Sequence, residues 1–178
     1  MSFAVRHNWR EHLQSLGAAA IGLSQDIIEN ACSHFNQVKE RQADLSFAAN
    51  KEDVVLFEVL AFEYFLLAHP ASCTQLERQG ELLTRVAENL WIYVSSRQSQ
   101  VTERLAFQEF LDRRFASYQT CLGGEDFLVR LADALLENLF PDQPQDGGLL
   151  AYFAMIAGTT SIANKRFFDR IAQTMRLA

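Results

Sequence analysis

The sequence predicts an all-α protein, a single-domain bundle of about six helices with two long helices at its ends. Two observations favour this fold. Apolar residues return every three or four positions along most of the chain, and no run of strand length alternates apolar and polar residues. Residues that cap or break helices separate these segments. A chain of 178 residues is also long enough to bury a full core without disulfides or a structural metal.

The first predicted helix runs from about residue 9 to residue 42. Asn8 followed by Glu11 resembles a capping box. Steps of three and four keep one apolar stripe on a single face of this helix. The stripe consists of Trp9, Leu13, Leu16, Ala20, Leu23, Ile27, Ala31, Phe35 and Val38. The pattern leaves open whether the helix is continuous or kinked near Gly22.

The second predicted helix spans residues 51–69, with Asn50 as its cap and Pro70 as its stop. Its apolar residues point in every direction, which predicts a central position in the bundle. The third predicted helix spans residues 74–96 and begins with the capping-box sequence of residues 74–77.

Three further helices complete the predicted bundle. The first of them carries apolar residues over 105–122 and ends at the two glycines that follow. Another covers residues 127–139. A loop with two prolines and two glycines then occupies residues 141–148. The last helix continues from Leu149 to the end of the chain.

Charge and composition exclude several classes of partner. The chain has 16 Lys and Arg against 22 Asp and Glu, a net charge of -6, whereas nucleic-acid binding needs clustered cations. The basic pair Arg113–Arg114 lies beside Asp112 and predicts a solvated helix face. The longest apolar segment, residues 54–68, is shorter than the roughly 20 residues of a membrane span. Three scattered cysteines without C-x-x-C spacing favour a cytoplasmic protein.

Glu58 and Glu63 are unusual because they lie in the helix that is apolar on all sides. At about 100° per residue they point about 140° apart, so one helix cannot direct both carboxylates at one metal. No histidine follows a glutamate at the spacing of a di-iron bundle, and neither a metal nor a cofactor is predicted. We expect each carboxylate to pair with an arginine of a neighbouring helix or to reach the edge of the bundle.

His34 lies beside the apolar stripe of the first helix. We expect it to be a hydrogen-bonded residue at the edge of the core, because no nucleophile or metal ligand accompanies it in the sequence. The phosphate-binding glycine motifs and the G-x-S-x-G motif of hydrolases are also missing from the sequence. An enzyme is therefore not the favoured interpretation.

Both long helices have a centre of small residues, at 17–22 and 157–161. We expect the two helices to cross closely at these points, because small side chains let backbones approach. In the alternative interpretation the small residues leave room for a ligand, with Thr159, Thr160 and Ser161 as hydroxyl donors.

Two functions follow as hypotheses. The favoured one is a non-enzymatic helical interaction module, a homodimer or a partner-binding adaptor, because the stripe of the first helix is longer than the helix of residues 127–139 that we expect against it. The alternative is a binder of a small apolar or aromatic ligand, suggested by 14 phenylalanines. Its candidate ligand-binding residues are Glu58, Glu63, Phe62, Phe65, Thr159 and Thr160.

A single structural feature separates these hypotheses. A cavity among the central phenylalanines favours a ligand, whereas a solid core with an apolar outer stripe favours association. These phenylalanines are Phe57, Phe62, Phe65 and Phe153.

Overall fold

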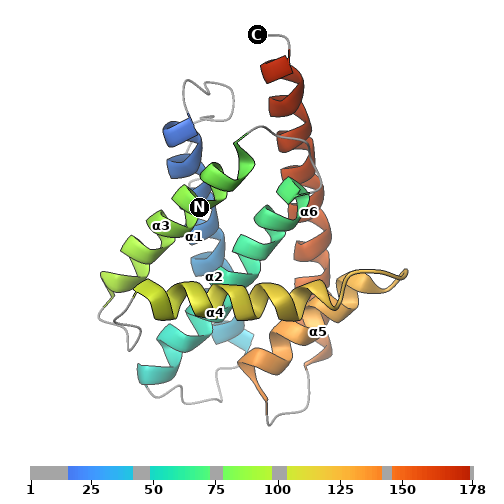
Figure 1. Ribbon diagram of the computed structural model, residues 1–178. Helices are drawn as coiled ribbons and strands as arrows, with labels where there is room; N and C mark the ends of the chain where they lie inside the picture. The colour runs from blue at the N-terminus through green and yellow to red at the C-terminus, as the bar shows by residue number, and fades with distance from the viewer. Residues whose placement is uncertain (1–15, 42–48, 73–77, 98–103, 142–145, 177–178) are drawn as a thin grey trace, which may run out of the picture.

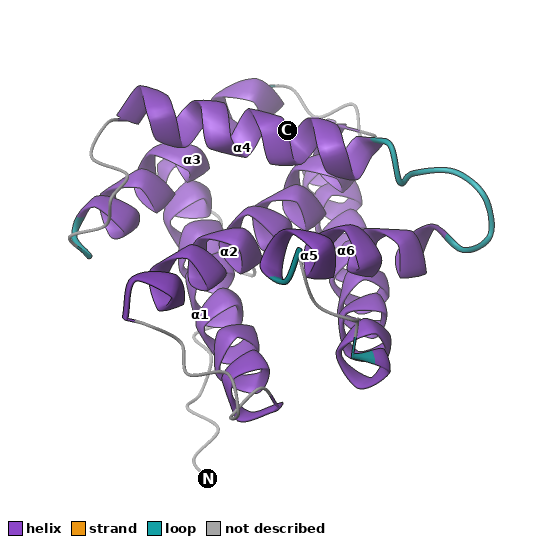
Figure 2. Cartoon of the chain, turned by 90° about the horizontal axis from the view of Figure 1, so that it is seen from below, coloured by secondary structure: helices purple, strands orange, loops and turns teal. Residues whose placement is uncertain are grey.

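The structure is a computed structural model that describes residues 16–41, 49–72, 78–97, 104–141 and 146–176. Within these ranges the chain forms six helices, which confirms the all-α bundle (Figure 1). Helices and loops account for the whole described part, without a strand (Figure 2). The helices are α1 (Leu16–Arg41), α2 (Ala49–Ser72), α3 (Gln79–Ser95), α4 (Arg104–Gln119), α5 (Phe127–Leu139) and α6 (Gly147–Arg176).

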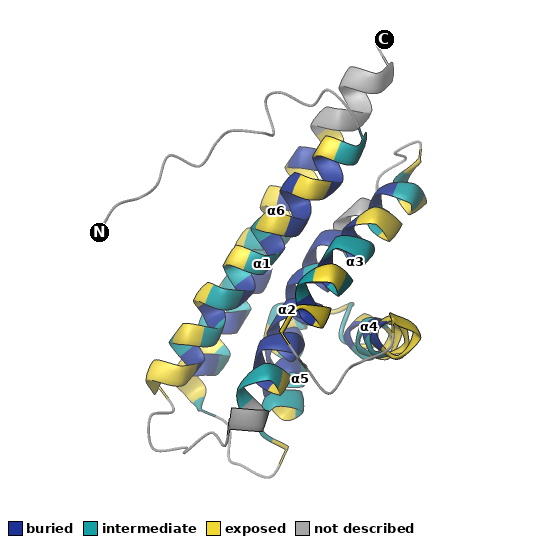
Figure 3. Ribbon diagram, turned by 90° about the vertical axis from the view of Figure 1, so that its left-hand side faces the viewer, coloured by how far each residue is buried: buried dark blue, intermediate teal, exposed yellow. Residues whose placement is uncertain are grey.

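The helices pack in layers (Figure 3). The two long helices α1 and α6 form one layer without packing closely on each other and run in opposite directions, while α2, α3 and α5 form a second layer against them (Figure 1). α4 crosses the outer side of the second layer and is seen end-on in Figure 3. α2 contacts all five other helices, and its residues from Val55 to Ala68 are buried except for half-buried Tyr64. The predicted central position of this helix is confirmed.

α1 turns its apolar stripe toward α2 and α3. The helix is continuous from Leu16 to Arg41, through Gly22. The stripe residues Ala20, Leu23, Ile27, Ala31 and Val38 are buried. We expected part of this stripe to need a second subunit, but between residues 16 and 38 the chain's own helices cover it. Trp9 and Leu13 lie outside the described residues.

α2 is longer at both ends than the predicted helix. It begins at Ala49, so Asn50 lies inside the helix and does not cap it. It also continues through Pro70 to Ser72, although a proline lacks the N–H that would bond to the carbonyl four residues earlier. That carbonyl belongs to Leu66, and it accepts a hydrogen bond of 3.1 Å from the side-chain amide of buried Asn164 on α6. A side chain of another helix thus replaces the bond that Pro70 cannot make.

α3 ends within one residue of its predicted end but begins five residues later than predicted, and α4 ends three residues earlier than predicted. α3 begins directly after Arg78, which has a φ of 62°, and the predicted capping box of residues 74–77 lies outside the described residues. The two glycines after α4, Gly123 and Gly124, have φ values of 111° and 83°. Glycine adopts this left-handed region without strain. α4 nevertheless ends at Gln119, four residues before Gly123, in a turn of backbone hydrogen bonds to carbonyls three residues earlier, so the glycines do not provide the predicted stop. α5 has the bounds predicted for it.

α6 begins earlier than predicted, because Gly147 and Gly148 open the helix and do not belong to the loop before it. The carboxylate of Asp146 accepts hydrogen bonds from the backbone N–H groups of Gly148, at 2.7 Å, and Leu149, at 3.3 Å. These bonds satisfy N–H groups that a helix start leaves without a partner.

The small-residue centres of the long helices face other elements than we expected. A Cβ added to Gly158 of α6 would lie 3.2 Å from Cδ1 of Leu128 on α5. Two residues after the small-residue centre of α1, the hydroxyl of Ser24 accepts a hydrogen bond of 3.2 Å from Asn89 on α3, and α1 packs on α3 and α2 but not closely on α6. The prediction that α1 and α6 cross closely at these points is therefore wrong. Each long helix instead approaches a shorter helix, and both pack against α2.

Candidate functional site

A polar cluster joins α1, α2 and α6 at the edge of the core. The hydroxyl of Tyr152 on α6 lies 2.6 Å from Nδ1 of His34 on α1. Nε2 of the same imidazole lies 3.2 Å from Oε1 of Glu63 on α2, and Asn30 donates a hydrogen bond of 3.4 Å to Oε2. Glu63 is 1% exposed and His34 is 8% exposed, whereas Tyr152 is half-buried. The three groups thus form a chain from the core toward the surface.

The direction of each proton in this cluster follows from the carboxylate. An ionised Glu63 only accepts hydrogen bonds, so Nε2 of His34, which faces it, carries a proton. The contact has an ion-pair distance without the alignment of a hydrogen bond. In the neutral imidazole Nδ1 is then the acceptor, and Tyr152 donates its hydroxyl proton to it. Hydroxyl, imidazole and carboxylate stand in the order of a nucleophile, its base and the group that orients the base.

The surroundings of Tyr152 keep its phenol protonated. Burial raises the pKa of Tyr152, the charge of Glu63 raises it further, and the charge of Arg41 opposes both. Arg41 is the last residue of α1 and reaches the first turn of α6, where a Cβ on Gly148 would lie 2.6 Å from its Nη1. Gly148 is four residues before Tyr152 and leaves room for the guanidinium beside the phenol.

Glu58 belongs to a separate contact, between α2 and α4. Nε of Arg114 donates to Oε2 of Glu58 at 2.7 Å, and Nη2 donates to Oε1. Desolvation by burial raises the pKa of Glu58, and the hydrogen bond and charge of Arg114 offset only part of this rise. The predicted arginine partner of Glu58 is confirmed. The predicted solvated face holds only for exposed Arg113, because Arg114 turns inward to the carboxylate.

The second glutamate differs from the prediction. Glu63 has no arginine partner within the described residues and contacts His34 and Asn30 instead. The expected place of His34, hydrogen-bonded at the core edge, is confirmed. The sequence reasoning missed Tyr152, because nothing relates it to a histidine 118 residues earlier. Its one signal is that it precedes buried Phe153 and therefore lies on the flank of the apolar face of α6.

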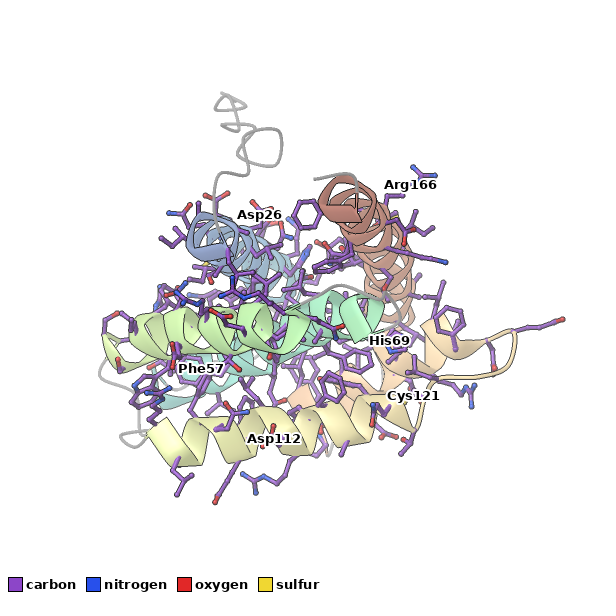
Figure 4. All side chains as sticks on the ribbon, turned by 45° about the horizontal axis from the view of Figure 1, so that its top comes forward. Asp26, Phe57, His69, Asp112, Cys121 and Arg166 are labelled. Atoms are coloured by element: carbon purple, nitrogen blue, oxygen red, sulfur yellow. The ribbon has the colours of Figure 1, made fainter. Side chains whose placement is uncertain are left out.

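The candidate ligand residues Phe62 and Phe65 lie in the core and contact other rings. The centroid of Phe62 lies 6.0 Å from that of Phe153 and 5.5 Å from that of Tyr118. The ring centroid of Phe65 lies 5.1 Å from that of Phe115. Edge-to-face contacts at these distances are typical of a packed aromatic core. Side chains fill the space between the layers in Figure 4, where buried Phe57 is labelled.

Thr159 and Thr160 do not join the polar cluster. Thr159 is exposed, and its hydroxyl donates to the backbone carbonyls of Met155 and Ile156 at 2.9 and 3.2 Å. Thr160 is half-buried. The hydroxyl of Thr159 is thus used by its own helix and is not directed into the bundle.

The outer side of α6 carries a line of exposed residues. Met155 is 57% exposed and Ile162 is 54% exposed, and a spacing of seven residues places them on the same side of the helix. Ala151 and Thr159 are exposed on this side as well. We call Ala151, Met155, Thr159 and Ile162 the α6 stripe. Exposed Arg166, labelled in Figure 4, follows the stripe at its C-terminal end.

Comparison of the chain with protein-family models, with curated proteins and with solved structures finds no match. The function must therefore be argued from the chemistry of the described residues. Within these residues, no three His, Cys, Asp or Glu side chains gather into a group that can hold a metal. None of the described helices has the length and apolar character needed to cross a membrane. Cys32 and Cys121 are free thiols.

Proposed function

We propose that the protein is a helical interaction module that pairs with a second copy of itself along the α6 stripe. The observation that supports this function is that Met155 and Ile162 are 57% and 54% exposed on one side of α6. Single exposed apolar residues are ordinary on protein surfaces, whereas several in line on one helix are typical of a docking face. We therefore propose the α6 stripe as the dimer contact and not the apolar stripe of α1, which other helices of the same chain cover between residues 16 and 38.

The α6 stripe is complementary to itself. A two-fold axis near Thr159 would place Met155 of one copy beside Ile162 of the other, so the same residues meet on both sides of the contact. The small side chain of Ala151 lets the helices approach. A contact limited to one helix face is small beside the interfaces of permanent complexes, and we expect a dimer that dissociates in the micromolar range.

The alternative, a small apolar or aromatic ligand, has less support. It needs space among the central aromatic residues, and the rings of Phe62 and Phe65 are in contact with neighbouring rings. Packed rings of this kind favour association through the surface over a ligand in the core.

Sedimentation equilibrium from about 1 to 100 µM tests the dimer. We expect the wild-type protein to show a monomer–dimer equilibrium. The double variant Met155→Glu, Ile162→Glu should be a monomer with unchanged helical circular dichroism, because exposed positions accept a carboxylate in the monomer but not in the apolar contact.

Ile92→Glu is the matched control, because Ile92 is 64% exposed on α3, away from the α6 stripe. This variant should dimerise like the wild type. A wild-type protein that stays at monomer mass over the whole concentration range would overturn the proposal, as would an equal loss of dimer in the control.

A further inference from the structure

We propose that Tyr152 is an acyl-acceptor site, whose hydroxyl takes an acyl group from an activated ester while His34 removes its proton and Glu63 orients the imidazole. This inference is independent of the α6 stripe and of dimer formation. It rests on three side chains that come from three different helices and meet at one edge of the core.

The geometry is that of a hydroxyl with its own base. The 2.6 Å between the Tyr152 hydroxyl and Nδ1 of His34 is within the range for direct proton transfer. The charge of Glu63, 3.2 Å from Nε2, favours a proton on that nitrogen and so leaves Nδ1 free to accept the proton of Tyr152. Because the phenol is half-buried, it is partly accessible to a reagent from solvent, while the carboxylate stays in the core.

The other three tyrosines of the chain all lie in its described part and have different partners. The hydroxyl of Tyr64 donates to a backbone carbonyl at 3.5 Å, and that of Tyr93 lies 3.3 Å from the thiol of Cys32. Tyr118 is fully buried, and its hydroxyl interacts with the side chain of Asn138. Tyr152 is thus the tyrosine that contacts an imidazole.

The acyl transfer proceeds in two stages that conserve protons and electrons. A lone pair of the Tyr152 oxygen forms a bond to the ester carbonyl carbon, and the hydroxyl proton moves to Nδ1 of His34. The imidazolium is then stabilised by the charge of Glu63. When the tetrahedral centre collapses, the bond to the leaving oxygen breaks, and this oxygen keeps the electron pair and takes the proton from His34. The products are O-acyl-Tyr152 and the free alcohol.

The need for a base follows from the surroundings of the phenol. Burial and the charge of Glu63 raise the pKa of Tyr152, so the phenol is not ionised at neutral pH. Its oxygen becomes a good nucleophile only while His34 is taking its proton. This feature distinguishes Tyr152 from a tyrosine that reacts through a preformed phenolate.

The charges around Tyr152 favour an uncharged acyl group over a phosphoryl group. One cation of the described residues, Arg41, lies at the first turn of α6 together with the carboxylate of Asp146, since a Cβ on Gly148 would be 2.6 Å from Nη1 and 3.0 Å from Oδ1. The carboxylate of Glu63 lies on the far side of the His34 imidazole. A phosphoryl group would add negative charge where carboxylates already outnumber the cation.

Acetylation by p-nitrophenyl acetate tests this inference on the full chain. The rate at each tyrosine is followed by peptide mass spectrometry at neutral pH. Tyr93 is the internal control, because it is also half-buried but has a thiol as its partner. We expect Tyr152 to be acetylated at least about tenfold faster than Tyr93. The variant Tyr152→Phe should lose the fast adduct.

Two variants separate base catalysis from simple exposure. His34→Gln keeps hydrogen-bonding groups in place but removes the base, and Tyr152 should then react no faster than Tyr93. Glu63→Gln keeps the shape of the side chain and removes its charge, so the imidazolium formed in the transfer loses its stabilising partner. We expect Glu63→Gln to slow Tyr152 while the rate at Tyr93 stays unchanged, a selective loss that general loosening of the fold would not produce.

The pH profile gives a further readout in the wild-type protein. The pKa of Tyr93 is raised to about 12 by burial and by Cys32, so its rate should climb about tenfold per pH unit through the neutral range. The rate of Tyr152 should rise less steeply with pH, because His34 and not hydroxide removes its proton. Equal rates for both tyrosines in the wild type, or an unchanged Tyr152 rate in folded His34→Gln protein, would overturn the inference.

Discussion

Glu58 and Glu63 are both buried carboxylates of α2, yet their surroundings differ. Glu58 meets an arginine whose side chain is 28% exposed, while its own side chain is 5% exposed. Glu63 meets the imidazole of His34, whose side chain is 10% exposed, and the amide of half-buried Asn30. Because a buried charge is costly without a partner, the consequence of a substitution depends on which member of the pair remains in the core.

The Glu58–Arg114 contact should respond asymmetrically to substitution. Glu58→Leu leaves Arg114, which reaches solvent, so we expect a change within about 1 kcal/mol in the free energy of unfolding. Arg114→Leu leaves the carboxylate in the core and should cost about 3–5 kcal/mol at neutral pH. Urea unfolding of both variants measures the difference. Equal losses in the two variants would contradict this account.

The pH dependence of stability provides a second check on Glu58. Its pKa is raised above 4.5 in the folded protein by desolvation, so the folded state holds this proton more tightly than the unfolded state. The stabilisation is complete below pH 4.5 and is lost as pH rises through the folded pKa. Wild-type protein should therefore lose stability relative to Glu58→Gln as pH rises from 4.5. The opposite trend in urea midpoints would mean that Arg114 outweighs desolvation.

At the scale of the helix, the end of α2 depends on α6. Asn164 bonds the Leu66 carbonyl that Pro70 leaves without a backbone partner. Asn164→Ala should therefore cost about 1–3 kcal/mol, since a buried carbonyl loses its hydrogen bond. In the Pro70→Ala background the backbone N–H is restored, and the same substitution should cost less. A double-mutant cycle by urea unfolding measures this coupling, and strictly additive costs would argue against it.

The contact between α5 and α6 depends on a glycine. A Cβ on Gly158 would lie 3.2 Å from Leu128, so Gly158→Leu should overpack the contact and cost about 1–3 kcal/mol despite its better helix propensity. Gly80→Ala is the control, because Gly80 is an exposed helical glycine with nothing within 4 Å of its added Cβ. The Gly80→Ala variant should be more stable than the wild type by up to about 1 kcal/mol. A stabilised Gly158→Leu variant would show that α5 can move to make room for the leucine and that the contact is not tightly packed.

For the whole molecule, the central position of α2 decides which surfaces remain free. The apolar face of α1 packs against α2 and α3, and the inner face of α6 packs against α2 and α5. The side of α6 that remains is the one with Met155 and Ile162. α1 keeps the single large apolar residue Ile21 exposed, at 54%, whereas α6 has two on one side. We therefore expect association through the long helices to use α6.

A charge on the buried stripe of α1 should unfold the molecule and not merely dissociate it. Ile27 is 4% exposed in a single chain, so Ile27→Glu places an unpaired carboxylate in the core and should cost several kcal/mol. We expect loss of helical circular dichroism or insoluble protein, whereas Met155→Glu should stay folded. A folded, monomeric Ile27→Glu variant would place the dimer contact on α1 after all.

The helices themselves were predictable because their signals are local. Apolar periodicity located six helices, α5 with its observed bounds, and the all-round apolar pattern of α2 identified the central helix. Local signals failed where a distant side chain intervened. In the sequence Pro70 predicts the end of a helix. In the structure the helix continues, because Asn164 on another helix bonds the Leu66 carbonyl that Pro70 leaves without a partner. Similarly, Gly147 and Gly148 predict a loop in the sequence. In the structure they lie in a helix, because the carboxylate of Asp146 caps its first turn.

The sequence by itself determined the all-α class, the number of helices and the burial of Glu58 and Glu63 on different sides of one helix, because each depends on spacing within a segment. Only the tertiary structure decided which helices meet and hence which polar groups pair. His34, Glu63 and Tyr152 come from three helices, and Tyr152 is 118 residues from its histidine. No periodicity encodes such a meeting, because it depends on how α1 and α6 pack against α2.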